Sequence, residues 1–165
     1  MKRFVLALLV GVVACGPGAK GGPSINNKIG GNDLPPPVSS VVSQDILARE
    51  PVANTAQVKH ILIGWKDLGD AYQGRIDPRA AKRDKAAAEA EVKSLVAQLQ
   101  AGADFDTMMK AHSEDLGSAS SARAYTVTPN AQLVIEFRQL GLRLKIGEIG
   151  VCESDFGFHI IKRIE

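Results

Sequence analysis

The sequence predicts an α+β domain in which helices and strands mix around one sheet. Two short runs of branched apolar residues, within residues 58–65 and 155–165, are typical of strands. Between them lie segments whose apolar residues recur at helical spacing, the longest over residues 80–102. No internal repeat is present, and a chain of 165 residues suits one domain with additional segments.

The first fifteen residues, MKRFVLALLVGVVAC, are typical of an exported protein. Two basic residues are followed by an apolar stretch, which is shorter than the roughly 20 residues of a transmembrane helix. We therefore interpret residues 1–14 as a secretory signal peptide. The ending VVAC resembles a bacterial lipobox, in which Cys15 would carry a lipid and become the mature N-terminus. The alternative is an ordinary signal peptide in which Cys15 has no role.

Residues 15–56 are predicted to be a lipid-anchored tether. The stretch GPGAKGGPSINNKIGGNDLPPPVSS is rich in Gly, Pro, Ser and Asn, and it has too little apolar surface to fold alone. Residues 43–50 are expected to form one or two helical turns, with Ser43 as N-cap. The folded domain, residues 57–165, is thus expected in the cell envelope, lipid-anchored to a bacterial membrane and facing the periplasm or another extracytoplasmic space.

The folded part is predicted to have the element order β–α–α–β–α–β–β. The third helix is expected to begin near Pro129 and to bury Leu133 and Phe137. In chain order the elements are a strand over 58–65, a helix over 80–102, a helix over 105–113 capped by Asp104, a turn-rich loop over 114–124, a strand over 125–128, a helix over 130–142, and strands over 151–154 and within 155–165.

The overall charge is nearly balanced. The net charge of +2 comes from 20 basic and 18 acidic residues, so nothing indicates nucleic-acid binding or a strongly basic membrane face. If Cys15 carries a lipid, Cys152 has no partner for a disulfide within the chain. We interpret Cys152 as a buried, inert thiol.

Two histidines lie inside the apolar strand runs, His60 in VKHILI and His159 in GFHIIK. Each could be a core side chain with a satisfied hydrogen bond, or the two could belong to one site. His112 lies at a helix end and is expected to be solvated. A zinc site made from all three is disfavoured, because no pair of them has the spacing of metal ligands.

Four stretches in this order resemble the parvulin-type peptidyl-prolyl cis–trans isomerases (rotamases). They are VKHILI, ADFDTMMKAHSED, LKIGEIG and SDFGFHIIKRIE, and together they span residues 57–165. The resemblance implies a four-stranded antiparallel sheet surrounded by helices, with a proline-binding site on its concave face. It implies no metal and no other cofactor. By position, the site residues implied are His60, His159, Asp115 and Ser154 at the catalytic centre, and Leu133 and Phe137 around the proline ring.

The implied reaction turns an X-Pro bond against a barrier of roughly 18–20 kcal/mol that is mostly amide resonance. An apolar pocket lowers this barrier by removing water from the carbonyl and gripping the ring. Leu133 and Phe137 stand at i and i+4 of the predicted helix and would present one apolar surface. No proton transfer is required, so the histidines are better interpreted as a scaffold that tunes Asp115.

Two departures from the family pattern concern the rim of the pocket. The segment 118–127, SASSARAYTV, lacks the glycines that many parvulins have there, and Phe156 stands where a Ser or Gly is common. The basic residues of the first loop alternate with aspartates, which argues against recognition of a phosphate and favours a solvated loop.

The sequence therefore predicts a lipid-anchored isomerase that assists the folding of exported proteins. Its substrates would be unfolded or partly folded chains with exposed X-Pro segments. One alternative is a non-catalytic chaperone or peptide-binding module with the same fold, which the altered segment 118–127 favours. Another alternative is a purely structural lipoprotein.

Overall fold

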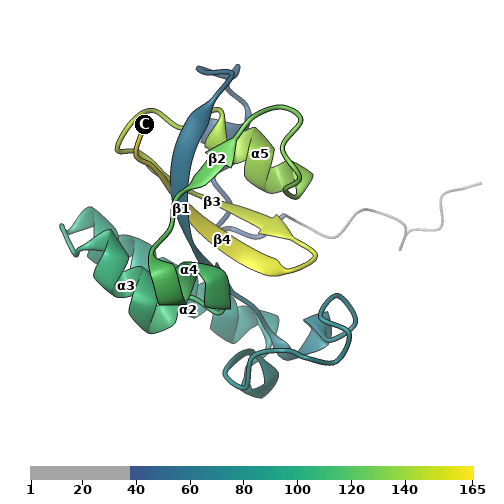
Figure 1. The fold of residues 1–165 in the computed structure, drawn as a ribbon. Coiled ribbons are helices and arrows are strands. Elements are labelled where there is room, and N and C mark those ends of the chain that lie inside the picture. The colour runs from purple at the N-terminus through teal and green to yellow at the C-terminus, as the bar shows by residue number, and fades with distance from the viewer. Residues whose placement is uncertain (1–37) are drawn as a thin grey trace, which may run out of the picture. The chain divides into compact units, whose positions relative to one another are not determined.

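The computed structural model describes residues 38–165 (Figure 1). The predicted signal peptide, Cys15 and the tether up to residue 37 lie outside the described residues. Among residues 38–165, no helix combines the length and the apolar character that crossing a bilayer requires.

Four antiparallel strands form one sheet in the order β2-β1-β4-β3. The strands are β1 Ala56–Ile63, β2 Tyr125–Val127, β3 Ile149–Ser154 and β4 Gly157–Arg163. The two central strands, β1 and β4, are far apart in sequence but pair from Val58 opposite Arg163 to Ile63 opposite Phe158. The predicted four-stranded antiparallel sheet is confirmed.

Helices cover both faces of this sheet. In the described residues these are α1 Gln44–Leu47, α2 Lys85–Gln100, α3 Phe105–His112, α4 Leu116–Ser121 and α5 Ile135–Gly141, with 3₁₀ turns η1 Lys66–Leu68 and η2 Ala80–Lys82. Asp104 caps α3 as predicted, because its carboxylate accepts a hydrogen bond from the amide of Thr107 at 2.8 Å. Asp84 caps α2 in the same way, so α2 begins at Lys85 and residues 80–82 form a separate turn.

Strand alternation divides the apolar side chains between two cores. Ile61 and Ile160 are fully buried and pack against α2 and α3 on one face. Val58 and Ile161 are also fully buried and point to the other face, where α5 and α1 cover them. Figure 1 shows α2 and α3 on one side of the sheet and α5 on the other. Because both faces are covered, β1 and β4 are buried along almost their whole length.

The segment predicted as a turn-rich loop contains a short helix, α4. Asp115 precedes it, and its carboxylate accepts hydrogen bonds from the amides of Gly117 at 3.1 Å and Ser118 at 3.3 Å. A capped helical turn therefore occupies part of the segment that lacks the family's glycines.

The helix α5 begins at Ile135 and not near Pro129 as predicted. Residues 130–134 form an irregular turn in which the Leu133 amide donates to the Ala131 carbonyl at 2.8 Å. Leu133 therefore lies outside the helix, and the prediction that it stands one turn from Phe137 on a single helix is wrong.

The folded unit begins earlier than the predicted boundary at residue 57. Ser43 lies against β3, where its amide donates to the Val151 carbonyl at 2.9 Å and its Oγ accepts from the Val151 amide at 3.0 Å. Its side chain therefore does not cap α1, contrary to the prediction. Ile46 is buried beneath α5, so this part of the predicted tether belongs to the domain.

The turn between β3 and β4 requires a glycine at position 157. Gly157 has a φ of +125°, and a Cβ atom there would lie 2.6 Å from the carbonyl oxygen of Ile63. The absence of a side chain lets β4 start directly against the end of β1. This contact fixes the position of Phe156, the preceding residue of the turn.

Candidate functional site

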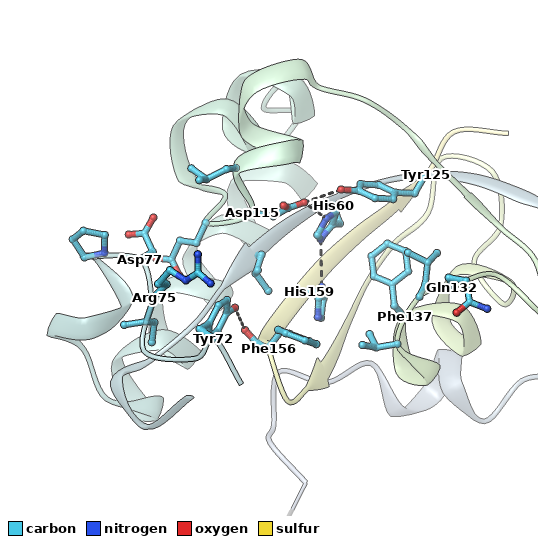
Figure 2. A pocket seen from close by; sticks show the side chains of 17 residues that line it. His60, Tyr72, Arg75, Asp77, Asp115, Tyr125, Gln132, Phe137, Phe156 and His159 are labelled. Atoms are coloured by element: carbon cyan, nitrogen blue, oxygen red, sulfur yellow. Dashed lines mark hydrogen bonds and ion pairs between the residues drawn. The ribbon is translucent and has the colours of Figure 1, made fainter. Parts of the chain in front are cut away.

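A cavity of about 640 Å³ opens on the sheet face that carries α5 (Figure 2). Its floor is formed by the central strands, which contribute His60 and Leu62 from β1 and His159 from β4. One end is lined by α5 and the turn before it. The other end is lined by the loop between η1 and η2, by Leu116 of α4 and by Phe156.

The two strand histidines meet at the centre of this floor. His60 and His159 are each 5% exposed, and their rings stack with centroids 5.4 Å apart. Their Nδ1 atoms are 3.3 Å apart and share a hydrogen bond. The pairing of β1 with β4 therefore brings together two residues that are 99 positions apart in the chain.

A row of hydrogen bonds runs through the histidines from Ser154 to Asp115. Ser154 Oγ lies 2.8 Å from His159 Nε2, and Asp115 Oδ2 lies 3.0 Å from His60 Nε2. An ionised carboxylate only accepts, so His60 donates from Nε2 and offers Nδ1 as an acceptor. His159 then donates from Nδ1 and accepts at Nε2 from the Ser154 hydroxyl. All four groups are satisfied with both imidazoles neutral.

Asp115 is held in its charged form. The hydrogen bond from His60 lowers the pKa of this carboxyl well below its usual range, and bonds from Ser118 and Tyr125 act in the same direction against the effect of burial. Ser118 Oγ donates to Oδ2 at 2.5 Å and Tyr125 Oη donates at 2.8 Å. In the described structure this carboxylate pairs with no lysine or arginine.

His159 is held in its neutral form. Burial, with a smaller effect from the neighbouring His60, lowers the pKa of His159 to about 3. With this pKa the ring stays neutral near neutral pH, so it does not serve as an acid that gains and loses a proton there. The geometry and the electrostatics therefore agree with a structural role for this ring at the site.

Phe137 provides the apolar end of the cavity. It is 3% exposed, and its ring meets His60 and His159 edge-on, with centroids 5.1 Å and 5.5 Å away. Leu133 lines the same end from the turn before α5 and is partly buried. The structure therefore brings all six sequence-predicted residues of the domain to one region, with Ser154 at one end of the hydrogen-bonded row.

The backbone around Asp115 is fixed by its two neighbours. Ser113 Oγ accepts a hydrogen bond from the Leu62 amide at 3.1 Å, and Glu114 Oε2 accepts from the Gly64 amide at 2.7 Å. Glu114 is buried and also pairs with Arg83. These bonds tie the end of β1 to the segment before α4 and so hold Asp115 over the sheet.

Two arginines of the first loop bond to groups within the domain. Arg83 donates to the Gly64 carbonyl at 2.7 Å and pairs with Glu114 and Glu91. Arg79 donates to the Ser113 carbonyl at 2.9 Å and pairs with Asp77 at 3.1 Å. Both arginines therefore stabilise the loop. Arg83 is largely buried, whereas Arg79 remains exposed, as expected for a solvated loop.

Three lining residues escaped the sequence analysis as site residues. Tyr125 donates to Asp115, and Tyr72 and Phe156 meet at the opposite end. The signal for Tyr125 was an aromatic residue in the short strand that follows the Asp115 segment. Nothing in the local pattern distinguishes Tyr72 from other loop residues.

Neither a metal group nor a reactive thiol is found at the site. Among residues 38–165, no cluster of three His, Cys, Asp or Glu side chains is placed to hold a metal ion. Cys152 is buried under the same face, and burial raises the pKa of its thiol, which keeps it protonated.

Comparison with known proteins identifies related sequences over the same residues. Residues 44–165 match the family model described as the PPIC-type PPIase domain. The foldase protein PrsA of Geobacillus kaustophilus is 29% identical over 73% of this chain, and the chaperone SurA of Nitrosospira multiformis is 38% identical over 66% of it. The chain spans only 43% and 22% of the length of these two relatives.

Solved structures share the fold. The solution structure of TbPIN1 matches with a TM-score of 0.58 and 21% identity, over 69% of this chain and 100% of that chain. The peptidyl-prolyl isomerase ESS1 from Candida albicans matches with a TM-score of 0.54 and 18% identity, over 68% of this chain and 63% of that chain. At these identities the likeness concerns the fold alone.

Proposed function

The chain belongs to the PPIC-type peptidyl-prolyl isomerase family, and from this premise we propose that its domain catalyses the cis–trans isomerisation of X-Pro bonds. The observation that carries the proposal is the cavity in which Phe137 and Leu133 lie beside the hydrogen-bonded row of Ser154, His159, His60 and Asp115. An apolar site for a ring thus adjoins a fixed negative charge.

The reaction needs no group that forms or breaks a covalent bond. The barrier of roughly 18–20 kcal/mol is mostly amide resonance, which moves charge from the nitrogen to the carbonyl oxygen. Twisting the bond reverses this movement. A site lowers the barrier when it favours the twisted, less charge-separated amide over the planar one.

Phe137 and Leu133 would hold the proline ring, and their apolar surfaces would remove water from the adjoining carbonyl. The ionised Asp115, which pairs with no lysine or arginine among residues 38–165, would disfavour negative charge on that oxygen. Both effects favour the twisted state. The histidines and Ser154 would act through Asp115 and the shape of the floor, as positioning residues.

The substrates would be unfolded or partly folded proteins with exposed X-Pro segments. The relatives named as a foldase and a chaperone support this class of substrate. Together with the signal-like start of the chain, they support a place outside the cytoplasm, at the periplasmic or extracytoplasmic side of a bacterial membrane.

The lipid anchor at Cys15 is a separate part of the proposal and rests on the lipobox-like ending VVAC. Its test is metabolic labelling with a fatty acid in a bacterial host. The Cys15→Ala chain should lose the label that the unchanged chain carries. A label that persists in Cys15→Ala would show that Cys15 is not the attachment site.

The activity is tested with the full-length chain in a protease-coupled assay on Xaa-Pro peptides, with peptide binding measured in parallel by NMR titration. We expect isomerisation faster than the uncatalysed rate in proportion to protein concentration. Turnover at the uncatalysed rate with peptide still bound would contradict the enzyme and support the non-catalytic binding module.

A further inference from the structure

The cavity is larger than the proline ring that its Phe137 end would hold. Its volume of about 640 Å³ falls within the range of roughly 300–1,000 Å³ that is usual for pockets holding drug-sized ligands. In Figure 2 the labelled residues form two groups, with Phe137 and Gln132 on one side of the histidines and Tyr72, Arg75 and Asp77 on the other. The second group, here called the first-loop end, has no role in holding the ring.

Apolar side chains are exposed at the first-loop end. Leu116 is 78% exposed and Phe156 is 37% exposed, and both line the cavity. Ile76 and Pro78 line it as well. Exposed apolar side chains gathered at the mouth of a cavity are typical of a surface that a ligand covers.

Tyr72 and Phe156 form an aromatic wall across this end. Their rings meet edge-on with centroids 5.6 Å apart, and Tyr72 Oη donates a hydrogen bond to the Phe156 carbonyl at 2.5 Å. The other hydrogen bonds of residues 69–76 stay within this loop tip or go to Leu68. In the described structure, the bond from Tyr72 to Phe156 therefore attaches the loop tip to the rest of the domain. The Tyr72 hydroxyl therefore holds the wall in position, and the rings of Tyr72 and Phe156 form its surface.

The bound chain would have to cross from one end of the cavity to the other. With the ring against Phe137 and the reacting bond over the central row, the residue before proline lies across that bond from the ring. Its side chain then faces the first-loop end. This placement rests on the proposed function, because it assumes that proline occupies the Phe137 end.

We propose that Tyr72 and Phe156 are specificity-determining residues, which receive the side chain before proline and select a large apolar or aromatic one. An aromatic side chain gains both apolar burial and edge-on contacts with the two rings. The Leu116 side chain adds to the same surface from the other side.

The charges at this end disfavour an acidic residue before proline. The carboxylates of Asp77 and Glu114 line the cavity, but each is paired with an arginine. Asp115 pairs with no lysine or arginine of the described residues, so its negative charge at the centre is not balanced in this way. Arg75 is exposed at the rim, where solvent and salt screen its charge. An anionic side chain placed beside Asp115 would be repelled.

The test compares peptides that differ only in the residue before proline, Phe, Leu, Ala or Glu, on the full-length chain. We expect kcat/KM to be highest for Phe and Leu, about three- to tenfold above Ala, with Glu lowest. Affinities of the same peptides, measured by NMR titration, should follow the same order.

Three variants separate the parts of the wall. Phe156→Ser removes one ring but keeps the carbonyl that accepts from Tyr72, and should lower kcat/KM for Phe-Pro by about three- to tenfold and for Ala-Pro by less. Tyr72→Phe keeps both rings but removes the hydroxyl, and should increase amide hydrogen exchange in residues 69–76 with a smaller loss of selectivity. Ile146→Ser is the matched control, because Ile146 is 71% exposed but does not line the cavity.

Two results would overturn the proposal. One is equal kcat/KM and equal affinity for Phe-Pro, Ala-Pro and Glu-Pro peptides in the unchanged chain. The other is a loss in Phe156→Ser that is the same for all peptides. Absence of turnover with every peptide would contradict the proposed activity alone, since the order of affinities still tests the wall.

Discussion

One face of the central sheet carries Ile61, Ile63 and Ile160, all without exposed surface, under α2 and α3. The other face carries His60 and His159 beneath an open cavity. The same strands build both faces, and each residue's face is decided by strand alternation alone. The first face is filled by apolar side chains, whereas the second is only partly covered by α5 and α1. One face of the sheet thus mainly stabilises the domain, and the other face carries the candidate site.

This separation matters because a site needs groups that a core excludes. A buried charge and buried hydroxyls cost free energy unless they are hydrogen-bonded. On the site face every member of the row from Ser154 to Asp115 has a partner. The polar site is therefore compatible with a stable sheet because the opposite face holds the larger apolar core.

The largest combined effect is expected for Phe137→Ala on the site face. Removal of this buried ring should lower the free energy of unfolding by about 3–5 kcal/mol. It should also lower kcat/KM by about 10- to 200-fold per folded molecule, since the ring pocket opens. Urea unfolding and the peptide assay on the folded fraction check both numbers. An unchanged kcat/KM would place the site elsewhere.

The matched change on the core face is Leu95→Ala. Leu95 is 2% exposed and packs in the core beneath α2. We expect a loss of about 2–5 kcal/mol in the free energy of unfolding, with kcat/KM per folded molecule within about twofold of the unchanged chain. If Leu95→Ala lost activity as Phe137→Ala does, the two faces would not be separable.

A third prediction concerns the pH dependence of stability. His159 has a pKa of about 3 in the folded chain, below the ordinary value of 6.5, so the unfolded chain takes up this proton first. The stability that the neutral ring provides is complete above pH 6.5 and is lost as pH falls toward 3. The slope of about 1.4 kcal/mol per pH unit gives a loss of about 3 kcal/mol between pH 6.5 and 4.5.

Urea unfolding at several pH values measures this slope. In His159→Gln the contribution of this group should disappear. His112→Gln is the control for replacing a histidine outside the site, because His112 lies half-exposed at the end of α3. A slope that is the same in all three chains would contradict the neutral state of His159.

The smallest effect is expected for Ser154→Ala at the end of the row. The change leaves His159 Nε2 without its hydrogen-bond donor, at a cost of about 1–3 kcal/mol in the free energy of unfolding. The imidazole nitrogen shifts of His159 should move in a ¹⁵N NMR spectrum, and Ser154→Thr should restore them. Unchanged shifts in Ser154→Ala would contradict the direction of the row.

The sequence predicts best those elements whose pattern is set by burial on both sides. β1 and β4 each contain a run of apolar residues, and their histidines stand out because they interrupt those runs. The start of α5 is predicted poorly, because residues 130–134 have helical apolar spacing but form a turn against the cavity. The packing of Ser43 and Ile46 is missed because their partners lie about a hundred residues away.

The same distinction applies to the site. Phe137, Leu133, His60, His159, Asp115 and Ser154 lie in segments whose resemblance to a family assigns them positions. Tyr72 lies in a loop without periodicity, and its partner Phe156 is 84 residues away. Sequence reasoning noticed Phe156 only as an unusual residue before Gly157. The contact of Phe156 with Tyr72 is visible only in the folded structure.

The pairing of β1 with β4 has a consequence for how the domain is made. Val58 pairs with Arg163, so the middle of the sheet closes a loop that contains almost the whole folded unit. Such a high contact order slows folding, because the entropy of loop closure is lost before the central contacts form. During vectorial synthesis or export, His60 emerges long before His159, so its hydrogen bond to His159 cannot form until then. A domain of this design would fold late, and its site would be incomplete until β4 is available.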